Sequence, residues 1–296
     1  MSTQIPTWMV EQYKNNVHVL AQQKGSRLAS TVRIDGDIIG ERVHYDRIGA
    51  VDAQKVTGRH QDTPLMNTPH SRRSAVMYDY DWADLVDKPD KLKTINDPTN
   101  FYAMQAVWAL GRAKDDEIIE AMFGSALSGK EGTTSIALPA AQKVAVDDHT
   151  YDAGSGNVGL TVSKLILAKE ILLSSDIDPD MEMFCACTRK QISDLLATTE
   201  VTSSDYNSVK ALVEGKVDTF MGFKFKTTEK MTLDASGHRQ VGCYSEVAVG
   251  LGLPQDVMVD IGPRRDKRNA TQVYASESAG AVRIEDEQLV EIACAI

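Results

Sequence analysis

The chain lacks the features that mark several common classes of protein. No apolar run reaches the roughly 18 residues that a transmembrane helix needs. The start, MSTQIPTWMVEQYKNN, is polar and has neither the basic nor the apolar region of a secretory signal. Only four cysteines occur in 296 residues, which is too few for a disulfide framework and fits a reducing compartment. Because 42% of the residues are hydrophobic, we expect a folded chain of about two domains with no membrane partner.

Positive charge is in short supply. The chain has 32 Lys and Arg against 42 Asp and Glu, a formal net charge of -10, which argues against a dedicated nucleic-acid-binding protein. The deficit is uneven, because residues 1–75 carry 10 basic and 7 acidic groups and are net positive. The remainder carries 22 basic and 35 acidic groups. The first quarter of the chain is therefore electrostatically different from the rest.

Motifs that carry catalysis are also missing. The six histidines show no HExxH or paired-ligand spacing, and there is no GxSxG elbow. Residues 124–130 match the start of a phosphate-binding P-loop, but Glu131 stands where the motif needs Ser or Thr. The run from Gly154 to Gly159 matches the dinucleotide pattern, yet no strand leads directly into it. Solvent loops are favoured at both places, and we expect no cofactor and no metal. A nucleotide-dependent enzyme that uses Gly154 to Gly159 stays as the less favoured alternative.

Several segments do have clear secondary-structure patterns. Residues 97–127 predict a long helix, with Asp97 as N-cap, Pro98 at the first position and Gly111 as its only breaker. Residues 160–174 predict a second helix capped by Thr161, and 189–197 and 203–214 predict short ones. MEMFCACT predicts a buried strand whose two thiols lie on opposite faces. The last 27 residues predict two strands around a turn at residues 278–280.

The first 80 residues look different. Residues 1–29 predict an arm with a short amphipathic helix that ends near Gly25. Residues 30–80 have extended character, two Pro near a cluster of Arg and His, and few large apolar side chains. Such a segment is either disordered or a long hairpin that packs on another molecule. The alternating run AVMYDYDW favours the hairpin.

Three stretches then carry a family resemblance. The first is ALGRAKDDEIIEAMFGSA, which resembles the spine helix of tailed-bacteriophage major capsid proteins. The second, RKQISDLLATTEVTSSDYNSVKALVEGKVDTFMGFKFKTTEKM, is similar to their middle region, and the third, VYASESAGAVRIEDEQLVEIAC, to their closing strands. The resemblance implies an α+β shell fold, which tailed phages share with encapsulins. It divides the chain into an N-terminal arm (1–29), an extended hairpin loop (30–80), a peripheral domain with the spine helix (81–130 and 261–296) and an axial domain (131–260).

The resemblance also implies a function. The chain would be a major capsid protein, not an enzyme, that assembles from pentamers and hexamers into an icosahedral shell around double-stranded DNA, without sequence-specific binding. Assembly would take place in the cytoplasm of a bacterial host, with scaffolding, portal and decoration proteins as partner classes. The alternative is an encapsulin-like nanocompartment shell. Because the basic first quarter faces an acidic remainder, we expect these residues at contacts between subunits: Trp8, Arg42, Arg47, Arg59, Arg72, Arg73, Arg264 and Arg265.

Overall fold

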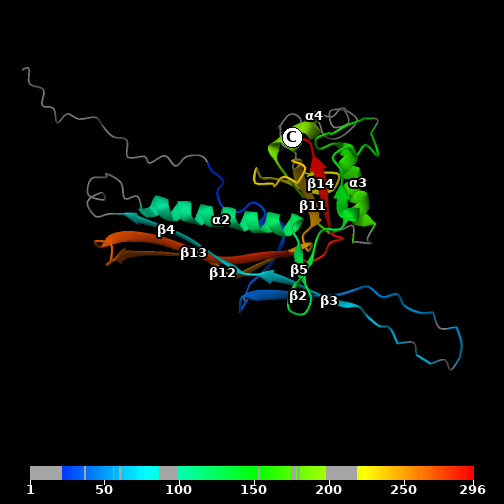
Figure 1. The fold of residues 1–296 in the computed structure, drawn as a ribbon, viewed down its shortest axis with the longest axis horizontal. Coiled ribbons are helices and arrows are strands. Elements are labelled where there is room, and N and C mark those ends of the chain that lie inside the picture. Colours follow the sequence, from blue (N-terminus) through cyan, green and yellow to red (C-terminus); the bar gives the residue numbers. More distant parts are fainter. Residues whose placement is uncertain are drawn as a thin grey trace, which may run out of the picture.

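The computed structural model describes residues 22–36, 38–55, 57–59, 62–63, 65–86, 99–152, 154–174, 178, 181–197 and 219–296. Its strands form three sheets, and an elongated part built on a long helix joins a rounder part that holds the C-terminus (Figure 1). The predicted short helix at 203–214, the helix in the arm, and the cap residues Asp97 and Pro98 lie outside the described residues. In the described part of the chain, no helix is both long and apolar enough to cross a bilayer.

The elongated part is a four-stranded sheet covered on one face by the predicted long helix. The strand order is β1 (Arg33–Asp35), β12 (Val249–Arg264), β13 (Ala270–Arg283) and β4 (Tyr78–Val86). Helix α2 (Thr99–Phe123) lies along this sheet and is about 37 Å long at 1.5 Å per residue (Figure 1). The small side chains Ala106 and Ala275 allow a close approach between helix and sheet, and Leu110 fills the space beside them.

The rounder part is a six-stranded mixed sheet with its own core. Its order is β7 (Lys143–Val144), β14 (Leu289–Cys294), β11 (Arg239–Ser245), β8 (Met183–Cys187), β10 (Phe223–Thr227) and β9 (Thr219–Phe220). Helices α3 (Val162–Leu173) and α4 (Arg189–Ala197) contribute to that core. As predicted, the Thr161 hydroxyl caps α3 by accepting from the Lys164 N–H. Strand β8 is buried along its whole length, which confirms the buried-strand prediction.

A third, smaller sheet joins the two parts. Its order is β2 (Arg42–Ile48), β3 (His70–Val76), β5 (Ala126–Ser128) and β6 (Thr134–Ile136). The remaining elements are short 3₁₀ turns at Ala29–Thr31 and Ala140–Gln142. The base of this sheet packs inside its own subunit, because Tyr45 and Ala75 are buried with Ala126, Val282 and Ile284. The extended segment is therefore shorter than the predicted 30–80.

Two predicted element boundaries are wrong. Helix α2 stops at Phe123, because the chain turns at Gly124 and residues 126–128 form strand β5. The turn predicted at residues 278–280 is continuous strand β13, and the chain passes from the four-stranded to the six-stranded sheet between β13 and β14. Gly280 allows a close approach of two backbone segments, because a Cβ at this position would lie 2.1 Å from the Val76 carbonyl oxygen.

Two further predictions need correction. Cys185 and Cys187 lie on the same face of β8, within one core cluster, because residues two apart in a strand point the same way. The run AVMYDYDW is divided between β3 and β4, which belong to different sheets.

The domain boundary expected between residues 260 and 261 falls inside strand β12. Strand β14, which was expected in the peripheral domain with residues 261–296, lies in the six-stranded sheet.

Candidate assembly surfaces

The β2–β3 hairpin projects from the molecule (Figure 1). The strands pair in register from Arg42 opposite Val76 to Ile48 opposite His70. One further backbone bond follows, from the Gly49 N–H to the Pro69 carbonyl at 2.9 Å. Beyond it, the described residues of the loop form no strand and are mostly exposed; Ile48 is 70% exposed and Leu65 is 95% exposed. The hairpin interpretation of this segment is thus confirmed over disorder, and the projecting part is the loop between residues 49 and 69.

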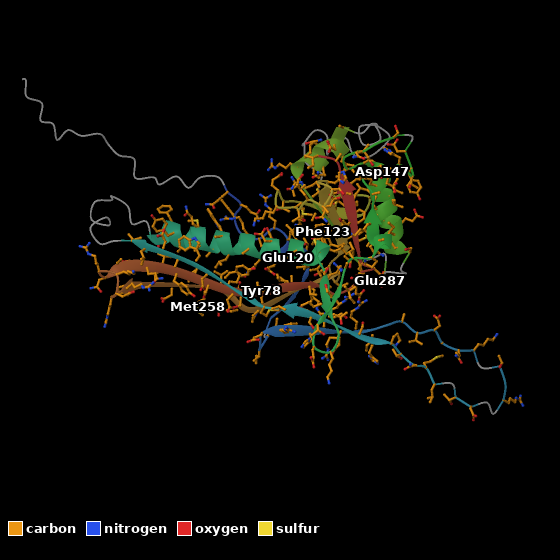
Figure 2. All side chains as sticks on the ribbon, viewed as in Figure 1. Tyr78, Glu120, Phe123, Asp147, Met258 and Glu287 are labelled. Carbon is orange, nitrogen blue, oxygen red and sulfur yellow. The ribbon has the colours of Figure 1, made fainter. Side chains whose placement is uncertain are left out.

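The exposed hairpin arginines are held by partners in their own chain. The Arg72 guanidinium pairs with Asp46 across the two strands at 2.5 Å, which raises the pKa of Arg72 and lowers that of Asp46. Arg47 reaches Glu287 at 3.5 Å, and Arg42 donates to the Glu131 carbonyl at 2.6 Å. Glu287 is labelled in Figure 2 near the base of the hairpin. Arg59 is exposed in the loop. These side chains lie on the surface of the subunit, where a neighbour can approach them.

Arg73 is different, and its predicted place at a subunit contact is not supported. It is 3% exposed and pairs with the buried Asp286 carboxylate. The same carboxylate accepts from the fully buried Arg283 at 2.6 Å. Arg283 also donates to the carbonyls of Met122, Gly124 and Ile136 at 2.7 to 3.1 Å. Arg73 therefore anchors the base of the hairpin to the end of α2. Its place in the strand could not predict this role, because its partner Asp286 lies far away in the sequence.

The second basic segment lies at the other end of the molecule. The turn between β12 and β13 carries Arg264, Arg265, Lys267 and Arg268, and only Asp266 opposes them. Arg264 donates to Asp266 at 2.9 Å, and Arg265 is exposed. Figure 1 shows this turn and the β2–β3 loop at opposite ends of the elongated part. The structure therefore places the predicted contact residues on two separate segments and does not bring them together. Trp8 lies outside the described residues.

The glycine run at 154–159 is not built to hold a nucleotide. Strand β7 ends at Val144, far ahead of it in the chain, and α3 begins only at Val162. The Nε2 atom of His149 lies 2.9 Å from the Gly156 carbonyl oxygen, and a Cβ on Gly159 would lie 2.3 Å from the Asp194 carboxylate. That carboxylate would repel a phosphate. The nearby Lys164 is buried and donates to three backbone carbonyls, so it ties the loop to the core.

A groove of about 880 Å³ runs between the end of α2 and the β7–β14 edge of the six-stranded sheet. Glu120, Phe123 and Asp147 line it, and Figure 2 shows their order along the molecule. Its other charged groups are largely paired, since Lys143 contacts Glu291 at 2.8 Å and Lys230 contacts Asp116. Among the described residues, no group of His, Cys, Asp and Glu could hold a metal ion.

A family model for phage capsid proteins matches residues 5–296. The chain belongs to the phage capsid protein family. No curated protein matches the chain. Among solved structures, this capsid protein is similar to the capsid of cyanophage P-SCSP1u, with a TM-score of 0.74 and 14% identity over 97% of this chain and 93% of that one. It is similar to the cyanophage Pam1 capsid, with a TM-score of 0.73 and 15% identity over 100% and 98%. For the Ralstonia phage GP4 capsid the values are 0.73 and 11%, over 100% and 98%.

These findings bear on the sequence-based predictions. The α+β shell fold is confirmed over the whole chain, and the family assigns this capsid protein a structural, shell-forming role. The capsid family favours the capsid interpretation over the encapsulin-like and nucleotide-dependent alternatives. Sequence reasoning missed Asp286, Glu287 and Asp115 as partners of the hairpin and of the N-terminal segment. The pairs that they form join residues about 90 to 240 positions apart, and no local pattern announces such pairs.

Proposed function

We propose that this capsid protein is the major shell subunit of a tailed phage, and that copies assemble as pentamers and hexamers into a closed icosahedral shell. The observation that carries the proposal is the projecting β2–β3 hairpin, where Ile48 at the end of β2 is 70% exposed and Leu65 in the loop is 95% exposed. Large exposed apolar side chains on a projecting segment mark a surface that packs on another molecule. In a shell of identical subunits, each hairpin finds the same surface on the next copy.

We further propose that the shell encloses double-stranded DNA and is assembled in the cytoplasm of a bacterial host. The formal net charge of -10 supports a container that holds DNA without binding it tightly, because each neutralised phosphate would add affinity. Four buried free thiols support assembly in a reducing compartment. Scaffolding, portal and decoration proteins would be the partners of such a shell. The residues proposed for contacts between copies are Trp8, Arg42, Arg47, Arg59, Arg72, Arg264 and Arg265.

The experiment is sedimentation and negative-stain electron microscopy of particles from infected or expressing cells, followed by nuclease treatment and extraction of nucleic acid. Phage particles should contain closed shells of this chain with nuclease-resistant double-stranded DNA. Closed shells that hold a protein cargo and no DNA would contradict the genome-container role while leaving shell formation intact. A protein that stays monomeric in both preparations would contradict the shell role itself.

A further inference from the structure

Residues 22–28 lie on one face of the long helix α2. The helix residues that meet them are Trp108, Gly111, Arg112 and Asp115, which share a face because they are three or four positions apart. The Lys24 ammonium stands 5.5 Å from the centre of the Trp108 ring. Arg112 donates to the Gln22 side chain at 3.0 Å and to the Gln23 carbonyl at 3.1 Å. The segment is therefore held by α2, whereas residues 1–21 of the predicted arm lie outside the described residues.

The Asp115 carboxylate is the centre of this contact. It is fully buried, and it accepts from the backbone N–H groups of Arg27 and Leu28 at 3.0 Å each. It also accepts from the Ser26 hydroxyl at 2.6 Å and from the Gln23 amide. Converging backbone N–H groups of this kind form a concavity that binds an anion. Here the anion is a side chain of the helix, and it fixes the backbone of two consecutive residues and the side chain of the residue before them.

Gly111 supplies the space for the crossing. A Cβ on Gly111 would lie 2.6 Å from Gly25 Cα and 2.7 Å from the Ser26 backbone nitrogen, closer than any real contact. Gly25 itself has φ +75°, a left-handed conformation that suits glycine. Two glycines therefore let the backbone of residues 25–26 lie directly against the helix backbone.

The held segment also reaches the six-stranded sheet. Arg27 donates to the Thr227 carbonyl at 2.7 Å, at the end of β10. The Thr31 hydroxyl lies 2.6 Å from the Tyr244 hydroxyl on β11, and both side chains are buried. The chain then pairs with β12 as strand β1. Residues 22–35 thus run from the spine helix past the six-stranded sheet to the four-stranded sheet, and they fix the position of residue 22.

We propose that Asp115 and Gly111 form a clasp, together with residues 22–28, that positions the N-terminal segment for assembly of the shell. The inference rests on the proposed function. The clasp lies at the edge of the core and most of its bonds run to residues 22–28, so its loss releases that segment first. Asp115 acts as a positioning residue: it fixes residues 22–28 against α2, and assembly depends on that position.

The test compares the full-length variants Asp115→Asn and Gly111→Ala with Asp116→Asn, a control in which the adjacent exposed carboxylate loses its charge. Hydrogen exchange of the amides in residues 22–28 should become about 100-fold faster in both clasp variants, while β8 and β11 stay protected. The control should match the wild type. Gly111→Ala is informative because alanine favours a helix more than glycine does, so the substitution should not weaken α2 itself. A loosened N-terminal segment in this variant would therefore result from the clash of the added Cβ with residues 25–26.

The assembly readout is the fraction of subunit that sediments as closed shells. The clasp variants should form at least tenfold fewer shells than the wild type, and Asp116→Asn should form as many. Faster exchange through the whole chain would overturn the proposal, since the clasp would then serve only the stability of the fold. Local loosening with a normal yield of shells would overturn the assembly role. If the wild type forms no shells, the proposed function fails, and the exchange data still decide whether the clasp exists.

Discussion

Arg72 and Arg73 are neighbours on β3, yet their surroundings are opposite. Arg72 pairs with Asp46 on the surface, and Arg73 pairs with Asp286 inside the subunit. An exposed ion pair contributes little to the stability of the fold, because water solvates both charged groups well when they are apart. A buried pair has already lost its water, so removal of one partner leaves the other charge unmatched. Two adjacent residues of one type therefore differ in what they do for the fold.

This contrast gives a matched prediction. Asp286→Asn should lower the free energy of unfolding by about 3 to 5 kcal/mol, because the Arg73 guanidinium stays buried without its counter-charge. Asp46→Asn makes the same chemical change beside Arg72 on the surface and should leave the urea midpoint unchanged. Equilibrium urea unfolding of both variants is the measurement. Equal effects of the two substitutions would contradict the assignment of Asp286 to the interior.

Glu117 offers a prediction that depends on pH. Burial raises the pKa of its carboxyl above the ordinary 4.5, Glu120 and Asp116 raise it further, and the hydrogen bond from Tyr80 opposes them. The folded state therefore binds a proton more readily than the unfolded state. Its stability falls as the pH rises from about 4.5 through the raised value. Glu117→Gln should remove this fall, so the variant should be more stable than the wild type at neutral pH and similar to it near pH 4.

The pH dependence is measured by urea unfolding between pH 4 and 8. Glu131→Gln serves as the control, because Glu131 is an exposed carboxylate that is not among the groups that shift the pKa of Glu117. Parallel stability curves for the wild type and Glu117→Gln would contradict the assignment of this pH dependence to Glu117.

At the scale of elements, the β2–β3 hairpin separates folding from assembly. Its base packs on the subunit through Tyr45 and Ala75, whereas the described loop residues between Gly49 and Pro69 form no strand and are mostly exposed. We predict that a two-residue Asn-Gly turn joining Ile48 to His70 leaves a folded, soluble subunit, because such a turn suits a hairpin. The same variant should form no closed shells.

Circular dichroism and thermal unfolding check the fold of this loop variant, and sedimentation checks its assembly. Leu65→Asp is a milder companion that keeps the loop length and places a charge at an exposed position of the loop. Loss of the subunit fold in the shortened variant would mean that the loop belongs to the core. Normal shells from it would mean that the loop makes no essential contact.

The elements show what a sequence can predict. Long periodic or capped segments were found correctly, as with α2 and the Thr161 cap of α3. The errors fall where long-range packing decides. Gly280 suggests a turn, but it serves a close approach to Val76, and the end of α2 is set by Arg283, which binds the carbonyls there. The candidate contacts were predicted by residue type alone, so Arg73 could not be told from Arg72.

At the scale of the whole molecule, the uneven charge of the sequence can be assigned to particular segments of the structure. The basic groups of the first quarter lie mainly on the projecting hairpin, and a second basic cluster marks the β12–β13 turn at the other end. The body between them is acidic. Basic side chains on these two segments suit contacts with the acidic body of another copy, and opposite charges brought together in this way set orientation more than affinity.

The most direct test of this account is a cryo-electron microscopy reconstruction of the assembled particle. The account predicts a closed icosahedral shell in which residues 49–69 of each subunit pack on the neighbouring subunit. A shell in which these residues contact only their own subunit or solvent would contradict it, as would a chain that never leaves the monomeric state.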